Sequence, residues 1–503
     1  MSEAVRRGLL RHAPSDFIGG SWQPLPAGAG GEAQICSVDP SQPSTTVWKA
    51  AAEPTHIDRA VAAARSAGRA WAEAPAATRH AALLRWRDVV VQHESRIADL
   101  LLLEAGKTRG EALLEAKALA EKVTITIEER TLERVRGFGI DLSPSRRGVC
   151  AFRPHGVMAV FGPFNFPAHL PNGHFVPALL LGNTVVLKPS ERTPAVGQLL
   201  AELAEEAAFP PGVFNVVQAA AAGASALAAH AHVDGILFTG SWPVGRRILQ
   251  ANIDRPGRIV ALEMGGSNPA VVLDDCHLKQ AVVECVRSAF ATAGQRCTCT
   301  RRVIVQRRIA DAFTGLLVEV ASRLRVGGGD EPGVFMGPLI SEAAREAVVA
   351  FQSRRVREGC VSLLAARAPA RAGWFLTPGV LRVERFSADA DEEVFGPLLQ
   401  IAVVDDDAEA VEQANATRFG LAAAVFTADE ARWHAIGARL RAGCVNWNVG
   451  TAGASSRLPF GGLGLSGNHR PAAAFSVDSC AFPVAHLEER TDAAPLPPGM
   501  DPF

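Results

Sequence analysis

The stretch DGILFTGSWPVGRRI, residues 234–248, decides the fold class of this chain. An apolar run leads into Gly240 and Ser241, and beyond Gly245 the composition is that of a helix. A strand that turns at glycines into a helix is the repeating unit of helix-covered sheets, and a nucleotide phosphate can bind where the helix amides and dipole point outward. The pattern G-S-x-x-x-G differs from the usual G-x-G-x-x-G fingerprint, so this stretch alone is at least as consistent with a plain strand–turn–helix junction.

The same alternation of apolar runs and helix-compatible segments continues on both sides of this stretch. Residues 56–130 are helical in composition, and Leu83, Trp86 and Val90 recur at i, i+3 and i+7. Runs typical of buried strands lie at 156–162, 183–190, 213–218 and 258–266, and a second series lies at 269–275, 302–308, 397–407 and 420–427. This rhythm predicts an α/β fold in which helices cover both faces of parallel sheets.

Two segments fit neither series. Residues 131–153 and 473–487 are strand-like and mixed in polarity, which would suit an arm that pairs with a neighbouring subunit. The C-terminal tail, residues 492–503, is proline-rich, and we expect it to be extended or frayed.

Charge and cysteine content exclude several classes of partner. Lysine plus arginine (51) almost equals aspartate plus glutamate (52), so no general attraction for nucleic acid or an anionic membrane is expected. The richest apolar stretch, 175–187, falls short of the roughly 20 residues that span a bilayer, and the N-terminal sequence does not resemble a secretory signal. None of the nine cysteines has C-x-x-C spacing, so no metal site is expected. We expect a cytoplasmic protein.

The motif VVLKPSE, residues 185–191, places two polar side chains at the end of a predicted strand. Lys188 and Glu191 could both bond a ribose, and the carboxylate of Glu191 would repel a 2′-phosphate, which favours NAD over NADP. In isolation the stretch is as well explained by a surface loop.

Three further motifs carry residues with catalytic potential. Glu263 ends an apolar run in ALEMGGSNP and would act as a general base if burial raised its pKa, although a glutamate there could equally pair with an arginine. Asn165 in GPFNFP could donate to an oxyanion or simply satisfy a turn. In GQRCTC, Cys297 and Cys299 raise the alternatives of nucleophile, metal ligand or disulfide.

Together these motifs resemble the aldehyde dehydrogenase superfamily. GPFNFP, KPSE, FTGS-x-x-x-G, LEMGG, GQRC, EEVFGP (392–397) and PFGGLGLSG (459–467) occur in that family's order and spacing, from about residue 18 to 487. The resemblance implies two doubly wound Rossmann-like domains plus a β oligomerisation arm, assembled as a homodimer or homotetramer. The implied divisions are an NAD-binding domain (1–130 and 154–262), a catalytic domain (263–445), a substrate-pocket loop region (446–472), and an oligomerisation arm and tail (131–153 and 473–503).

The resemblance also implies roles for individual residues. Cys297 would be the nucleophile, Asn165 and the Cys297 N–H would bind the oxyanion, and Glu263 would activate water, with no metal required. The implied NAD contacts are Lys188, Glu191, Gly240, Ser241, Gly245, Glu393 and Phe395. One departure is Pro243, which removes an amide donor from the first turn of a helix that would otherwise bind phosphate.

Longer stretches at 161–183, 289–302 and 467–475 resemble the branch of the superfamily that oxidises N-succinylglutamate 5-semialdehyde in arginine breakdown. A substrate bearing carboxylates predicts cationic or hydroxyl groups at the pocket mouth. The candidates are Arg296, Ser455, Ser456 and Arg457, each of which could equally be a solvated loop residue. His169 and His174 lack the spacing of a helical metal pair, and structural hydrogen bonding is expected of them.

Three other functions remain open at this point. The substrate could be another acidic semialdehyde, such as succinic or glutamic semialdehyde. The acyl group could pass to coenzyme A, although the presence of Glu263 disfavours this. A non-catalytic NAD-binding protein is the third alternative, and the retention of all three candidate catalytic residues opposes it.

Overall fold

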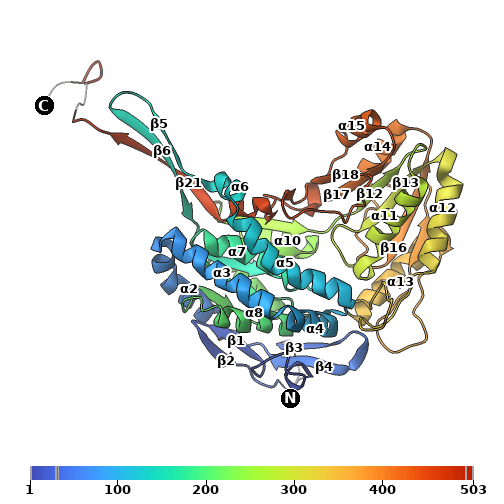
Figure 1. Cartoon of the computed structure of the whole chain (residues 1–503), viewed down its shortest axis with the longest axis horizontal. Coiled ribbons are helices and arrows are strands. Elements are labelled where there is room, and N and C mark those ends of the chain that lie inside the picture. Colours follow the sequence, from blue (N-terminus) through green and yellow to red (C-terminus); the bar gives the residue numbers. More distant parts are fainter. Residues whose placement is uncertain (1–2, 29–30, 32, 493–495, 501–503) are drawn as a thin grey trace.

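Two seven-stranded sheets, each flanked by helices, organise the chain (Figure 1). This computed structural model describes residues 3–28, 31, 33–492 and 496–500. The predicted α/β class is confirmed, and each expected strand from 156 to 427 overlaps a strand of the structure.

The first sheet has the order β11-β10-β7-β8-β9-β1-β2. Its parallel strands are β7 (Val157–Phe161), β8 (Thr184–Lys188), β9 (Phe214–Val216), β10 (Gly235–Gly240) and β11 (Ile259–Met264), and β1 (Ser15–Ile18) and β2 (Ser21–Pro24) add an antiparallel edge. The helices around it are α2 (Thr55–Glu73), α3 (Ala76–Gln92), α4 (Glu94–Ala105), α5 (Arg109–Ile127), α7 (His169–Leu180), α8 (Pro194–Glu206), α9 (Ala221–Ala229) and α10 (Trp242–Ala251). Every residue of β7 and β8 is buried, as expected of parallel strands covered on both faces.

The second sheet has the order β14-β15-β16-β13-β12-β17-β18. Its strands are β12 (Asn268–Val272), β13 (Thr300–Gln306), β14 (Val361–Leu364), β15 (Gly379–Arg382), β16 (Leu398–Val404), β17 (Ala422–Phe426) and β18 (Cys444–Trp447). Its helices are α11 (Leu278–Phe290), α12 (Arg307–Ser322), α13 (Glu342–Arg357), α14 (Asp407–Asn415) and α15 (Glu430–Gly437). Only β14 runs antiparallel to its neighbour, so both sheets are mixed at an edge rather than fully parallel as the sequence suggested.

Several short elements surround these two sheets. They are α1 (Glu3–Arg6), the hairpin β3 (Gln34–Asp39) and β4 (Gln42–Ala51), α6 (Glu129–Leu132), the 3-10 turns η1 (Glu133–Val135), η2 (Ala291–Gly294) and η3 (Gly464–Ser466), and the pair β19 (Pro459–Phe460) and β20 (Ala472–Ala473). None of the helices in the described ranges is both long and apolar enough to cross a lipid bilayer.

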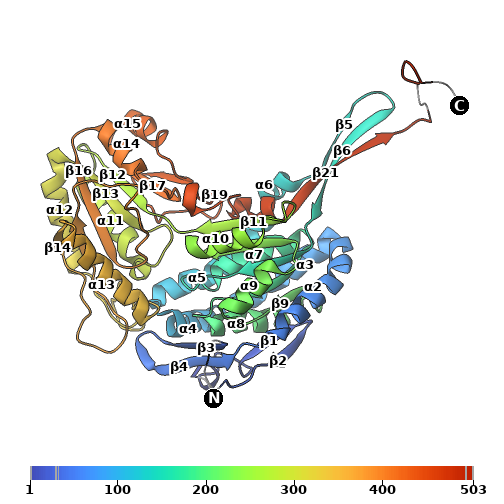
Figure 2. The ribbon, with the colours of Figure 1, turned by 180° about the vertical axis from the view of Figure 1, so that it is seen from behind.

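A three-stranded sheet projects from the body of the molecule (Figures 1 and 2). It contains β5 (Phe138–Asp141), β6 (Arg146–Pro154) and β21 (Ala481–Glu489), with β6 in the middle and antiparallel to both neighbours. Segments more than 300 residues apart in the sequence therefore form one arm.

The expectation of strand structure was wrong for residues 474–479. They form the 3-10 segment η4 (Ala474–Ser479), because this stretch packs on α5 instead of pairing with a strand. The buried amine of Lys122 donates to the Ala473 carbonyl (2.6 Å) and to the Ser476 hydroxyl (2.8 Å). The expected extended tail lies partly outside the described residues, and residues 496–500 are in neither helix nor strand.

Candidate active site

Four of the candidate segments meet at one edge of the first sheet. The strands β11, β10, β7 and β8 are neighbours and run parallel, so their carboxyl ends lie side by side. Glu263 lies near the end of β11, Gly240 ends β10 and Lys188 ends β8, while Asn165 follows β7 by four residues. Ligands of open α/β sheets bind outside this edge.

Two glycines pack closely at the start of α10. A Cβ on Gly240 would lie 2.4 Å from the Phe238 ring, and one on Gly245 would lie 2.4 Å from the Met264 sulfur, so a larger residue at either position would displace a neighbouring side chain. Ser241 precedes the helix and its side chain makes no capping bond. Pro243 lies in the first turn, where its missing N–H costs no helical hydrogen bond.

Lys188 and Glu191 form an ion pair with an Nζ–Oε2 distance of 2.9 Å. Burial raises the pKa of Glu191, but the Lys188 ammonium more than offsets this, and the net shift is downward. The Glu191 side chain is about half exposed and carries a negative charge at neutral pH, so it can bond hydroxyl groups and repel a phosphate.

Glu393 reaches across to the glycines that follow β11. Its Oε1 accepts from the Gly266 N–H (3.1 Å), and a Cβ on Gly265 would collide with its carboxylate. Burial raises the pKa of Glu393 to about 7, although Arg301 pulls it down. Phe395, two residues on, meets the Phe164 ring edge-on at 5.9 Å and so connects this loop to the Asn165 turn.

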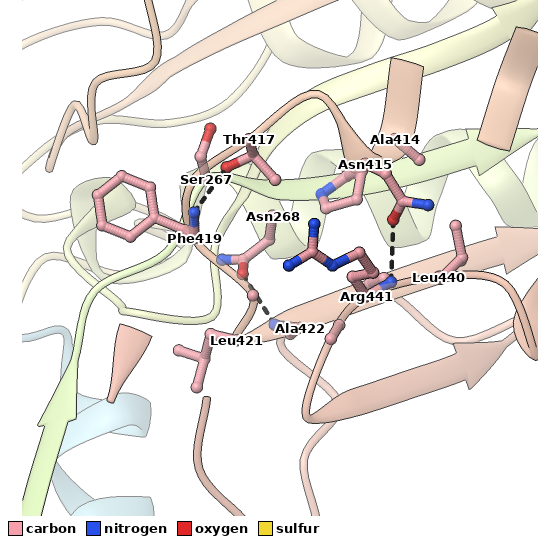
Figure 3. A pocket seen from close by; sticks show the side chains of 14 residues that line it. Ser267, Asn268, Ala414, Asn415, Thr417, Phe419, Leu421, Ala422, Leu440 and Arg441 are labelled. Carbon is pink, nitrogen blue, oxygen red and sulfur yellow. Dashed lines mark hydrogen bonds between the residues drawn. The ribbon is translucent and has the colours of Figure 1, made fainter. Parts of the chain in front are cut away.

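The turn that carries Cys297 is fixed by two asparagine side chains. Nδ2 of Asn268 donates to the carbonyls of Cys297 (2.7 Å) and Cys299 (2.9 Å), while its Oδ1 accepts from Ala422 N–H at 3.0 Å (Figure 3). Nδ2 of Asn165 donates to the Gln295 carbonyl at 3.0 Å. Both asparagines are buried, and each joins the turn to a different part of the fold.

The two cysteines of the turn lie in different environments. Cys299 is completely buried, whereas Cys297 is partly exposed, and both are free thiols. Burial raises the pKa of the Cys297 thiol, the nearby carboxyl groups of Glu263 and Glu393 raise it further, and the Thr298 N–H partly opposes them. The thiol is therefore protonated at neutral pH in the free protein.

The Glu263 carboxyl group is 1% exposed, and among the described residues neither of its oxygens has a hydrogen-bond partner. Burial raises its pKa well above the ordinary value. An unpaired buried carboxyl is costly and its raised pKa suits proton transfer, so this group marks a site rather than a packing position.

The four substrate candidates do not converge in the structure. Nε of Arg296 donates to Thr292 Oγ1 (2.8 Å) and Nη2 donates to Glu111 (3.2 Å), so this guanidinium is held beside the turn that carries Cys297. Arg457 is exposed and pairs with Glu128, just beyond the end of α5. Ser455 and Ser456 lie in the same loop as Arg457, with Ser455 exposed and Ser456 partly exposed.

The predicted structural hydrogen bonding is found for one of the two histidines. His174 Nε2 bonds the Thr239 hydroxyl at 2.7 Å, whereas the buried Nδ1 of His169 has no partner among the described residues. Burial lowers the pKa of His169 to about 4 and that of His174 to about 3, so both rings are neutral at physiological pH.

Several residues that shape the site were not identified from the sequence. Asn268 lies within the quoted LEMGGSNP motif, but only the fold reveals that its amide reaches the turn that carries Cys297. Asn468 is part of the distinctive GNHRP stretch, and its side chain bonds the β11 backbone at Leu262 N–H (2.7 Å) and the Val260 carbonyl (3.0 Å). The local pattern of Glu111 is that of a helix cap with Thr108, and it gives no sign of the contact with Thr292, 181 residues away in the sequence.

Comparison with known proteins agrees with this geometry. The model of the aldehyde dehydrogenase family matches residues 28–481. The chain is 44% identical over 463 residues to N-succinylglutamate 5-semialdehyde dehydrogenase of Cronobacter sakazakii, covering 91% of this chain and 94% of that protein. HpcC from Thermus thermophilus superposes with a TM-score of 0.92 at 31% identity, covering 99% of this chain and 97% of that one. Betaine aldehyde dehydrogenase from Staphylococcus aureus, solved in complex with NAD+, has a TM-score of 0.89 at 26% identity, covering 97% of each chain. The chain therefore belongs to the aldehyde dehydrogenase family and is an NAD- or NADP-dependent oxidoreductase that acts on an aldehyde.

Proposed function

We propose that this protein catalyses the NAD-dependent oxidation of N-succinylglutamate 5-semialdehyde to N-succinylglutamate, a step in arginine breakdown. The observation that carries the chemistry is the buried carboxyl of Glu263, which has no hydrogen-bond partner among the described residues and lies close enough to Cys297 to raise the pKa of its thiol. The substrate assignment is supported by relatives of that name, 44% identical in Cronobacter sakazakii and 42% identical in Serratia proteamaculans.

In the proposed mechanism Cys297, as the thiolate, attacks the aldehyde carbon. The resulting oxyanion accepts from the Cys297 N–H and from Nδ2 of Asn165, whose first hydrogen is held by Gln295 and whose second is free to point at the substrate. A nicotinamide bound beside Cys297 would supply the hydride acceptor, and loss of hydride from the tetrahedral adduct would leave an acyl thioester on Cys297. The pKa of the Cys297 thiol is high in the free protein, so the mechanism requires that binding of the cofactor or the aldehyde lowers this pKa and favours the thiolate.

Hydrolysis of the thioester is assigned to Glu263. A carboxylate with a raised pKa takes a proton from water more readily than an ordinary glutamate, and Glu263 has no competing partner among the described residues. Water attack then releases the carboxylic acid and regenerates Cys297. This assignment disfavours transfer of the acyl group to coenzyme A.

NAD is proposed over NADP because of Glu191. Lys188 and Glu191 would bond the adenine-side ribose, Gly240, Ser241 and Gly245 would line the pyrophosphate, and Glu393 and Phe395 would hold the nicotinamide ribose. A 2′-phosphate would lie beside the ionised carboxylate of Glu191, which costs binding energy.

The domain assignments are proposed with the same boundaries as above. The division is supported by the two separate sheets, whose strands come from residues 15–264 and 268–447. Substrate carboxylates are proposed to bind near Arg296, with Ser455, Ser456 and Arg457 as more distant candidates.

Assembly as a homodimer or homotetramer is proposed from the arm. Its exposed apolar side chains include Phe138, which is 61% exposed, and Leu487, which is 73% exposed, together with Ile140 and Leu142. Apolar side chains grouped on a projecting sheet are typical of a surface that another chain covers.

The direct test is NADH formation with a panel of semialdehydes. We expect kcat/KM for N-succinylglutamate 5-semialdehyde to exceed that for succinic and glutamic semialdehydes by about tenfold or more, because each smaller semialdehyde lacks one of its two carboxylates and would leave the cation proposed to bind it unpaired. The variant Cys297→Ala should bind NAD normally and form no NADH. Faster turnover of either smaller semialdehyde would contradict the substrate assignment, and acyl-CoA formation exceeding hydrolysis would contradict the role of Glu263.

A further inference from the structure

Glu111 lies in the first turn of α5 and contacts two separate parts of the chain. Its Oε2 accepts from the N–H (3.3 Å) and the hydroxyl (3.1 Å) of Thr108, while the Thr108 hydroxyl accepts from the Glu111 N–H, which completes a capping box. The other oxygen, Oε1, takes no part in the capping box and instead accepts hydrogen bonds from residues 292 and 296.

That second oxygen holds the turn before the nucleophile. Oε1 accepts from the Thr292 N–H (2.7 Å), from the Thr292 hydroxyl (2.8 Å) and from Nη2 of Arg296 (3.2 Å). Nε of Arg296 also donates to the Thr292 hydroxyl at 2.8 Å. One carboxylate oxygen therefore receives three donors from a five-residue segment that ends next to Cys297.

The segment that Glu111 holds has an unusual backbone. Thr292 (φ 55°), Ala293 (φ 53°) and Gly294 (φ 69°) are three successive residues in the left-handed region, which residues with a Cβ rarely adopt. Such a conformation persists only where surrounding contacts impose it. At Thr292 the contact is Glu111, and at Gly294 the carbonyl accepts from Nη2 of the buried Arg301 at 2.6 Å.

The direction of the turn decides where the proposed reacting groups lie. Gln295 follows the left-handed run, and its carbonyl holds the amide of Asn165. Cys297 comes two residues later. If the Thr292 N–H lost its acceptor, both the oxyanion donor and the sulfur would be free to move.

We propose that Glu111 is a positioning residue that fixes Cys297 and Asn165 for attack on the aldehyde by holding the Thr292–Gly294 turn. The inference rests on the proposed roles of Cys297 and Asn165. A displacement of about 1 Å in a reacting group can cost roughly 100-fold in rate, so a residue that touches no substrate can still control kcat.

The test compares three substitutions at one position with a control. Glu111→Ala removes the acceptor, Glu111→Asp keeps the charge but withdraws it by one methylene, and Glu111→Gln keeps an acceptor oxygen for Thr292. Thr108→Ala is the matched control, because it breaks the capping box and leaves the acceptor of Thr292 in place. The readouts are kcat, KM for NAD, and the rate at which iodoacetamide labels Cys297, measured by peptide mass spectrometry relative to the exposed Cys36 in the same sample.

We expect kcat to fall by about 100-fold in the alanine and aspartate variants with KM for NAD within twofold of wild type, and the glutamine variant to recover most of the loss. Labelling of Cys297 relative to Cys36 should change by about threefold or more in the alanine and aspartate variants, because a loosened turn alters the burial of the thiol, which is the main cause of its raised pKa. If the alanine variant does not fold, the same measurements on the aspartate variant test the inference.

Wild-type kcat together with a labelling ratio within threefold of wild type in both variants would overturn the inference, as would an equal fall in kcat in Thr108→Ala. If the wild-type protein oxidises none of the semialdehydes, the proposed function is wrong. The labelling ratio alone then tests whether Glu111 positions Cys297.

Discussion

At the scale of single residues, the Glu263 carboxyl group combines deep burial with the absence of a hydrogen-bond partner among the described residues. Its folded-state pKa lies above the unfolded value of 4.5, so the folded protein binds this proton more tightly. Stability is therefore lost as the pH rises from the unfolded pKa toward the folded one.

Replacement of Glu263 by glutamine should remove the loss of folding stability at high pH, because glutamine does not ionise. Each unit of pKa difference corresponds to about 1.4 kcal/mol, and about 1 kcal/mol raises the Tm of a domain of this size by roughly 2–4 °C. We expect Glu263→Gln to raise the Tm by at least about 2–4 °C at pH 8 and to leave the Tm unchanged at pH 4. Differential scanning calorimetry of both proteins across this range measures the effect. An equal Tm at pH 8 would mean that the carboxyl group is not destabilised by burial.

Glu191 gives a prediction about cofactor choice at the same scale. Glu191→Ser removes the negative charge that opposes a 2′-phosphate while keeping a hydroxyl for the ribose. We expect the ratio of kcat/KM for NADP to that for NAD to rise by about tenfold or more, since removing one like-charge contact near the surface releases about 1–4 kcal/mol. Steady-state kinetics with both cofactors measures this ratio, with Glu205→Ser, on an exposed part of α8, as the control. An unchanged ratio would show that Glu191 does not select the cofactor.

The sequence predicted single residues well where they ended strands or turns. Lys188, Gly240 and Glu263 lie at strand ends as expected, because short apolar runs identify buried strands and the residue after each run is fixed with it. It could not find Asn268 or Glu111, because each acts through a hydrogen bond to a segment distant in the chain. It also could not foresee that Arg296 is bonded to Glu111.

At the scale of elements, β11 is the edge strand of the first sheet, and an edge strand needs its backbone groups satisfied. The segment after η3 supplies hydrogen-bond partners for the β11 backbone. Asn468 bonds the β11 backbone on both sides of Ala261, and its own N–H donates to the Leu262 carbonyl at 3.1 Å. The side chain of one asparagine thereby replaces part of a missing neighbouring strand next to Glu263.

The variant Asn468→Ala should loosen this end of β11. Two hydrogen bonds are lost at about 0.5–1.5 kcal/mol each, so the Tm should fall by several degrees. The hydrolysis step should slow more than the hydride step, because Glu263 is the group that moves. Pre-steady-state NADH formation should therefore show a larger burst relative to the steady rate than wild type does. A fall in Tm with an unchanged burst would restrict Asn468 to a structural role.

Periodicity was sufficient for the longer buried strands and insufficient for most of the short ones. Strand β7 is apolar throughout and β8 has an apolar centre, whereas β1, β2, β14, β15 and β18 have only four residues each and were missed. Residues 474–479 were misjudged because the buried Lys122 amine binds the Ala473 carbonyl and the Ser476 hydroxyl, contacts that no local pattern encodes.

At the scale of the whole molecule, the arm carries apolar surface away from both sheets (Figure 1). The double variant Ile140→Asp, Leu487→Asp should break the proposed homodimer or homotetramer into a smaller species, because charges placed on the proposed apolar contact oppose association. Light scattering after size-exclusion chromatography measures the mass, and Arg136→Ala, an exposed residue just before β5, serves as the control. An unchanged mass would exclude this surface from the subunit contact.

The arm was foreseen only in outline. Its strands come from two segments that fit neither αβ series, and their composition indicated strands without indicating that β6 would lie between β5 and β21. The pairing of residues 146–154 with 481–489 is a long-range choice that single-sequence patterns do not specify.

The most direct test of the central claim is to trap the acyl group on the protein. Glu263→Gln is mixed with NAD and N-succinylglutamate 5-semialdehyde, quenched in acid and analysed by peptide mass spectrometry. The account predicts one equivalent of NADH and an N-succinylglutamyl thioester on the peptide that contains Cys297. NADH formation without an adduct at Cys297, or with the adduct on Cys299 or another cysteine, would contradict it.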